Sequence, residues 1–199
     1  MTIAREYGSG GADIGRKVAE LLGWECVDKQ IIERVATLGK VDPSWATKAD
    51  ECSSAWWERA LQSFRFGSPQ AYLGKGAESG GDRDTLREFT ASVIERAAIE
   101  GQCVIIGRSA QCVLRRHPNV FHALVFAPLA EKTERMKIRH PHERDLQALL
   151  SRIDSERTHY TQHYYGQDWS DRGLYHLCVN STLGIDSCAN LIAQTIRSS

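Results

Sequence analysis

A glycine-rich segment near the N-terminus constrains the fold of this chain most strongly. Residues 2–5 are typical of a short strand, and residues 6–15 form a turn-like run, Glu-Tyr-Gly-Ser-Gly-Gly-Ala-Asp-Ile-Gly. Apolar residues then recur at helical spacing at Ile14, Val18, Leu21 and Leu22. Glycines between a strand and a helix let the backbone approach an anion closely, and the helix N–H groups point towards it. The segment therefore predicts a phosphate-binding loop, with Gly23 placed to end the helix.

The charge balance of the chain narrows the classes of partner. The 199 residues contain 25 Lys plus Arg and 25 Asp plus Glu, so the formal net charge is zero. A general nucleic-acid or anionic-membrane binder is normally basic. The sequence also has no apolar run of the length needed to cross a bilayer. We therefore expect a soluble, cytoplasmic protein of one domain, with neither nucleic acid nor membrane as a partner.

Predicted strands alternate with predicted helices along the chain. The strand-like segments are residues 2–5, 24–27, 103–106, 120–126 and 174–180. The helical patterns are residues 14–22, 30–38, 56–64, 85–100, 110–115, 128–139, 142–165 and 185–196. Residues 66–84 are rich in Gly and Ser and predict a mobile loop. The alternation predicts an α/β fold with a central parallel sheet between two layers of helices and right-handed crossovers.

Polar or turn-forming residues follow four of the predicted strands. They are the glycine loop after the first, Asp28 after the second, Arg108 after the third, and Ala127-Pro128 after the fourth. Ligands of open α/β sheets bind at these carboxyl ends.

The helical pattern over residues 142–165 adds arginines around Asp154, among them Arg152 and Arg157. An arginine-rich helix is commonly a solvated face with ion pairs, whereas phosphoryl transfer needs arginines that close over phosphate. The residues alone favour both interpretations equally.

Taken together, these residues resemble the nucleoside monophosphate kinases, and most closely the cytidylate kinase-like family. The resemblance covers nearly the whole chain. The segments that carry it are residues 4–11 with Ile14-Gly15, Asp28-Lys29, Gly107-Arg108, residues 127–129, residues 152–157, Tyr164-Tyr165-Gly166, residues 169–171 and residues 175–181. It implies a P-loop NTPase fold in one domain over residues 1–199. Residues 1–23 would hold the phosphate loop and first helix, residues 28–100 the acceptor-binding segment with an insert at 45–84, and residues 133–165 the lid.

The resemblance also implies roles for individual residues. Donor ATP would be bound by Arg5, Gly8, Ser9, Gly10, Gly11, Ala12, Asp13, Ile14, Arg16 and Lys17. The acceptor would be bound by Asp28, Arg108 and Ser109. Catalysis would rest on Arg139, Arg152, Asp154 and Arg157, with Asp154 orienting an arginine or contacting the acceptor. Mg²⁺ would bridge the donor phosphates, and Ser9 would offer it a hydroxyl.

Three positions depart from what the resemblance implies. When the loop is aligned on its helix, Gly11 stands where a P-loop has lysine, and Ala12 where it has Ser or Thr. That lysine reaches the β- and γ-phosphates, and Arg5, Arg16 or Lys17 would have to replace it. In addition, Ser109 stands where ordinary cytidylate kinases have an aspartate after Gly-Arg.

These departures leave three hypotheses. The first is a kinase that transfers a phosphoryl group from ATP to CMP or dCMP. The second is a catalytically weak or inactive nucleotide sensor or regulatory protein on the same fold. The third is a kinase for another small acceptor, because a fold does not fix a function. A pair of tryptophans, Trp56-Trp57, is consistent with structural packing, a substrate platform or a homodimer contact.

Overall fold

The computed structural model describes residues 1–28 and 82–198, which form a parallel sheet flanked by helices. The strands are β1 (Thr2–Arg5), β2 (Glu25–Val27), β3 (Cys103–Ile106), β4 (His122–Phe126) and β5 (Leu177–Asn180). Their order across the sheet is β2-β3-β1-β4-β5, and each neighbouring pair is parallel. The predicted α/β fold is confirmed. Because β1 is the central strand, the loop that follows it lies at the middle of the sheet edge.

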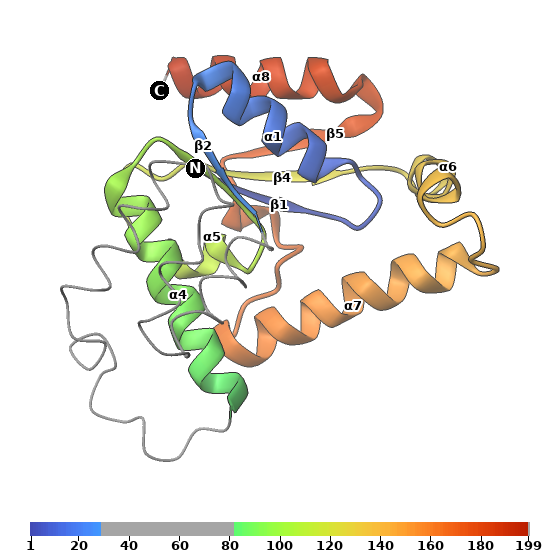
Figure 1. Cartoon of the computed structure of the whole chain (residues 1–199), viewed down its shortest axis with the longest axis horizontal. Coiled ribbons are helices and arrows are strands. Elements are labelled where there is room, and N and C mark those ends of the chain that lie inside the picture. The colour runs from blue at the N-terminus through green and yellow to red at the C-terminus, as the bar shows by residue number, and fades with distance from the viewer. Residues whose placement is uncertain (29–81, 199) are drawn as a thin grey trace, which may run out of the picture.

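Helices cover both faces of this sheet (Figure 1). The helices are α1 (Gly11–Leu22), α4 (Asp82–Glu100), α5 (Ala110–Val113), α6 (Leu129–Arg139), α7 (Leu146–Tyr165) and α8 (Ile185–Arg197). Two 3₁₀ turns are η3 (Arg172–Leu174) and η4 (Ser181–Leu183). Helices α1 and α8 cover one face side by side, and α4 and α5 cover the other, which gives the three expected layers. No helix of the described ranges is long and apolar enough to cross a membrane.

The two faces of the sheet bury separate apolar clusters. Ile14 and Val18 of α1 and Ile192 of α8 pack on one face and are fully buried. On the other face, Val93 and Ile94 of α4 pack against the strands. Burial of such side chains is the main favourable term in folding, at roughly 1.5–3 kcal/mol for each large aliphatic residue. The buried strands read as continuous apolar runs because they are covered on both faces.

Several element boundaries differ from the sequence-based expectations. Helix α4 begins at Asp82, so the predicted loop does not extend to residue 84. Helix α7 begins at Leu146 rather than residue 142, because the side chain of Asp145 accepts a hydrogen bond from the Ala148 N–H at 2.9 Å and caps it. Strand β5 begins at Leu177, since residues 172–174 form a 3₁₀ turn. The helices predicted over residues 30–38 and 56–64, the rest of the loop and the Trp56-Trp57 pair lie outside the described residues.

Candidate active site

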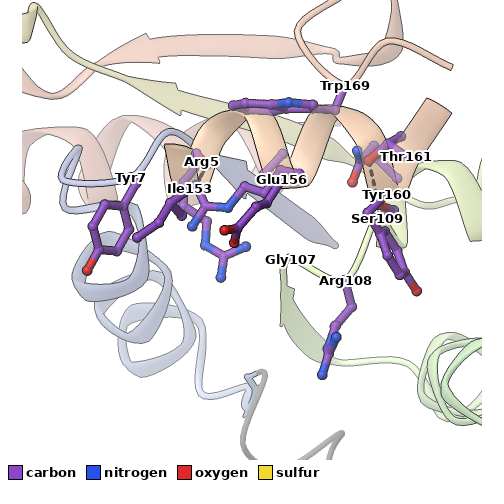
Figure 2. Close-up of a pocket in the computed structure, with 13 residues that line it drawn as sticks. Arg5, Tyr7, Gly107, Arg108, Ser109, Ile153, Glu156, Tyr160, Thr161 and Trp169 are labelled. Carbon is purple, nitrogen blue, oxygen red and sulfur yellow. Dashed lines mark hydrogen bonds between the residues drawn. The ribbon is translucent and has the colours of Figure 1, made fainter. Parts of the chain in front are cut away.

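A cavity of about 550 Å³ lies at the carboxyl ends of β1 and β3, beneath α7 (Figure 2). The strand ends contribute Arg5, Gly107, Arg108 and Ser109 to its wall. Helix α7 contributes Ile153, Glu156, Arg157, Tyr160 and Thr161. The edge of the sheet where ligands were expected is therefore hollowed, and side chains from two distant parts of the chain surround it.

Three arginines give the cavity an excess of positive charge. Burial, helped by the nearby charges of Arg157 and Arg108, lowers the pKa of Arg5 to about 10, against the opposing effect of Asp154 and Asp28. The Arg5 guanidinium lies directly against Gly107, where an added Cβ would stand 2.7 Å from Cζ. A buried guanidinium beside two further cations is stabilised by a bound anion. The cavity therefore suits a phosphate-bearing ligand.

Arg157 connects α7 to the end of β1 and to the glycine loop. Its Nη1 donates to the carbonyl oxygen of Arg5 at 2.7 Å and to Oδ1 of Asp154 at 2.8 Å. Its guanidinium also lies over the ring of Tyr7, 5.7 Å from the centroid. Burial lowers the pKa of Arg157, although the Asp154 carboxylate raises it. Arg157 is thus held in place at the cavity wall by contacts with both β1 and the loop.

The carboxylate of Asp154 binds the glycine loop itself. Its Oδ1 accepts from the Tyr7 N–H at 2.9 Å as well as from Arg157. Burial raises the pKa of Asp154. The Tyr7 N–H, Arg157 and Lys132 lower it, but their combined effect is smaller, so the net shift is upward. Asp154 lies beside an arginine, as the resemblance implies, but sequence reasoning missed its contact with the loop.

The glycine loop has the backbone that a phosphate cradle requires. Gly8 and Gly10 have φ values of +81° and +78°, which other residues rarely adopt. A Cβ at Gly8 would lie 3.0 Å from Leu150 Cδ2 and 3.1 Å from Lys132 Cβ. The loop leads directly into the N-terminus of α1 at Gly11. A glycine-dependent loop, a helix N-terminus and the arginine-lined cavity together fit the phosphates of a nucleotide.

Ser9 faces the protein interior in this conformation. Its side chain is fully buried, and its Oγ donates to the Glu6 carbonyl oxygen at 2.8 Å. Its own carbonyl oxygen accepts from Arg135 Nη1 at 2.9 Å. Within residues 1–28 and 82–198, no group of three His, Cys, Asp or Glu side chains is placed to hold a metal ion. The role of Ser9 as a Mg²⁺ ligand stays a prediction, and it would need the loop to rearrange, because the Ser9 Oγ is bonded to the Glu6 carbonyl oxygen.

Four of the predicted cationic residues are exposed or half-buried and lie outside the cavity wall. Arg16 and Arg139 both pair with Asp13, at 2.6 Å and 2.5 Å. Lys17 pairs with Glu20 on the same helix at 3.2 Å. Arg152 is 67% exposed and pairs with Glu156, one helical turn away, at 3.6 Å. The structure brings Arg5, Arg108 and Arg157 together and leaves these four cations in ion pairs on the surface.

The predicted acceptor residues lie at the ends of β2 and β3. Asp28 follows β2, and its charge acts on Arg5. Arg108 and Ser109 follow β3 with φ values of 55° and 51°. Such strain in non-glycine residues is concentrated at functional sites. The Ser109 side chain lines the cavity, and its Oγ lies 2.8 Å from the Thr161 Oγ1, which joins β3 to α7. Its role at the acceptor stays a prediction.

Helix α6 contributes two cationic residues whose contacts with the loop were not predicted from the sequence. The Lys132 Nζ donates to Oε2 of Glu6 at 2.9 Å, and Arg135 donates to the Ser9 carbonyl oxygen and to Ser181. The two are three residues apart and therefore share one helix face. This spacing was visible in the sequence, but nothing there identified the face that meets the loop.

Comparison with known proteins places this arrangement among the kinases. The model of the cytidylate kinase-like family matches residues 1–183. An uncharacterized protein from Eubacterium ventriosum ATCC 27560, known from a crystal structure, is similar with a TM-score of 0.71 at 21% identity, over 100% of this chain and 98% of that one. Shikimate kinase from Acinetobacter baumannii in complex with shikimate is similar with a TM-score of 0.53 at 14% identity, over 99% and 92%. At these identities the two structures show the fold alone. No curated protein matches.

Proposed function

Because this chain belongs to the cytidylate kinase-like family, we propose that it transfers a phosphoryl group from ATP to a nucleoside monophosphate, with CMP or dCMP as the acceptor. Family and fold support a nucleotide kinase-type function. The choice of base rests on the family alone. Mg²⁺ would enter with the substrate ATP.

The observation that carries the proposal is the arginine cluster beside the glycine loop. Arg5, Arg108 and Arg157 line one cavity at the edge of the sheet. In the proposed reaction an oxygen of the acceptor phosphate attacks the γ-phosphorus, the bond to the β–γ bridging oxygen breaks, and ADP leaves with that electron pair. Catalysis of this kind consists of positioning and charge stabilisation, so the reaction requires no nucleophilic side chain. The three guanidinium groups would stabilise the charge on the transferring oxygens.

A division of labour along the chain is part of the proposal. Residues 1–23 would bind the donor phosphates, residues 28–100 the acceptor, and residues 133–165 would form the lid. Contacts that pin α6 and α7 onto the loop support the lid assignment, because Arg135 and Asp154 bind the backbone of Ser9 and Tyr7. Most of the acceptor segment lies outside the described residues, and the homodimer and the cytoplasmic location stay predictions.

The experiment is a coupled assay of ADP release with ATP, Mg²⁺ and a panel of nucleoside monophosphates. We expect turnover that depends on one pyrimidine monophosphate and that is lost in Arg108→Ala. ADP release that is independent of every acceptor, or undiminished in the variant, would overturn the assignment of the cavity.

A second candidate is a nucleotide sensor without turnover. It is favoured by the state of the loop, where the Tyr7 N–H donates to Asp154 and the Ser9 N–H to the Glu6 carbonyl oxygen at 3.3 Å. Neither N–H group is available to a phosphate until these bonds break. This candidate predicts nucleotide binding without ADP release. A third candidate is a kinase for another small acceptor. It stays open because the fold is similar to that of a shikimate kinase, and one fold serves several acceptors.

A further inference from the structure

The missing loop lysine raises the question of which cation reaches the donor phosphates. The lysines within the described ranges are Lys17, Lys132 and Lys137. Lys17 pairs with Glu20, and Lys137, which is 58% exposed, pairs with Glu134 at 2.6 Å. Of these three lysines, only Lys132, whose side chain is 13% exposed, lies against the glycine loop. Burial of a lysine is costly unless it is paired, so its position calls for an explanation.

The Lys132 side chain passes beside Gly8 and ends between two carboxylates. Its Cβ lies 3.1 Å from where a Cβ of Gly8 would be. Its Nζ is 2.9 Å from Oε2 of Glu6 and 3.9 Å from Oδ2 of Asp154. The other oxygen of Asp154 accepts from the Tyr7 N–H. The ammonium group and a backbone N–H of the loop therefore share one carboxylate.

The groups around Asp154 are those that bind phosphate oxygens. A backbone N–H of the glycine loop donates to its carboxylate at 2.9 Å, and the Arg157 guanidinium donates at 2.8 Å. The Lys132 ammonium group lies nearby on the other oxygen, at 3.9 Å. P-loops offer a phosphate the same combination of loop N–H groups and a lysine, and phosphoryl-transfer sites add arginines. The Asp154 carboxylate thus marks a position that the surrounding charge reserves for an anion.

We propose that Lys132, supplied by α6, takes the part of the absent loop lysine and binds the β- and γ-phosphates of ATP. In the nucleotide-free chain the carboxylates of Glu6 and Asp154 hold its ammonium group. Nucleotide binding then transfers the ammonium group from these carboxylates to the phosphates, which its flexible four-carbon stem and rotatable donors allow. The inference rests on the proposed function. The alternative to this binding role is a purely structural role, in which Lys132 only fixes α6 to the loop through Glu6.

The test is calorimetric binding of the non-hydrolysable analogue AMP-PNP, with Mg²⁺, and separately of CMP, to the full chain. The variants are Lys132→Gln, which can still donate a hydrogen bond to Glu6, and Lys132→Arg, which keeps the charge. Lys137→Met is the matched control on the same helix. We expect the Gln variant to bind AMP-PNP about 10- to 100-fold more weakly, as for the loss of a charge-assisted hydrogen bond. CMP binding should be unchanged, and the Arg variant should recover much of the AMP-PNP affinity.

Each other result separates the two claims. Equal AMP-PNP affinity in Lys132→Gln and the wild type would overturn the role of Lys132 while leaving the kinase proposal intact. An equal loss of AMP-PNP and CMP binding, with a lowered melting temperature, would show the structural role instead. A wild-type chain that binds no AMP-PNP would overturn the proposed function, and this inference with it.

Discussion

The carboxylate of Asp154 accepts a hydrogen bond from the backbone N–H of Tyr7 at 2.9 Å, although the two residues lie 147 positions apart in the chain. This bond ties α7 to the glycine loop. Arg157 reinforces the tie, because it donates both to the same carboxylate oxygen and to the carbonyl oxygen of Arg5. Movement of the lid and the state of the loop are therefore coupled through one side chain.

Removal of that carboxylate should destabilise the fold. In Asp154→Ala the Tyr7 N–H loses its acceptor, and the partly buried Arg157 loses its carboxylate partner. Loss of such bonds costs about 1–3 kcal/mol in the free energy of unfolding. Urea unfolding measures this free energy. Glu134→Ala is the control, because it removes an exposed carboxylate. Equal stability of Asp154→Ala and the wild type would show that the tie contributes nothing.

A methyl group at Gly107 should disturb the arginine cluster. Gly107 has a φ of +81°, and its Cβ would lie 2.7 Å from Cζ of Arg5, so Arg5 would have to leave its place. Gly23 is a matched control, because its φ is +67° and nothing lies within 4 Å of its Cβ. Both alanine variants carry the strain of left-handed backbone, about 1–2 kcal/mol. Only Gly107→Ala should also lose nucleotide affinity, as measured by calorimetry. Matching losses in the two variants would contradict the account.

Two arginines of α7 should differ in their contribution to turnover. Arg157 lines the cavity and contacts the loop, whereas Arg152 is 67% exposed and pairs with Glu156 on its own helix. We expect Arg157→Ala to lower kcat about 10²- to 10³-fold, as for the loss of a charge that stabilises the transition state. Arg152→Ala should stay within a factor of a few of the wild type. Steady-state kinetics of ADP release measure both, and the reverse order would place the phosphates elsewhere.

A buried histidine far from the cavity should make stability depend on pH. Burial, together with the charges of His176 and the N-terminus, lowers the pKa of His122 to about 4. Between pH 6.5 and 4 the unfolded chain therefore binds a proton that the folded chain does not, and stability falls as the pH falls. The pKa difference corresponds to about 3 kcal/mol.

The matched variant for this prediction is His122→Gln. Its amide can still bond with the Thr2 Oγ1, which lies 2.7 Å from the His122 Nδ1, but it does not titrate. Urea unfolding at pH 7 and pH 4 should show the additional loss in the wild type and not in the variant. Parallel losses in the two proteins would mean that other groups cause the acid sensitivity.

The sequence predicted the sheet and the edge where the cavity lies, because both depend on local patterns. Apolar runs such as residues 103–106 identify strands that are buried on both faces, and they are observed as β3. The turn after each strand then places Arg5 and Arg108 at one edge. The first helix is also fixed locally, by apolar spacing and by Gly23 in the left-handed conformation at its end.

The contacts between distant elements could not be predicted in the same way. Arg139, Arg152 and Arg157 look alike in the sequence, but of these three only Arg157 lines the cavity. Which side of α6 and α7 meets the sheet depends on how the helices dock, and the helical repeat alone does not determine it. The contact of Lys132 could not be predicted for the same reason, because its partner Glu6 is 126 residues away in the chain. Ser109 was expected at the acceptor, and its bond to Thr161 depends on that docking too.

The central claim is that this chain transfers a phosphoryl group although its loop has no lysine. The most direct measurement is ADP release with ATP, Mg²⁺ and CMP, made beside calorimetric binding of each nucleotide to the same preparation. We expect ADP release that depends on CMP and that saturates at the concentrations where CMP binds. Binding of both nucleotides with no ADP release would contradict it and would identify the chain as a nucleotide sensor.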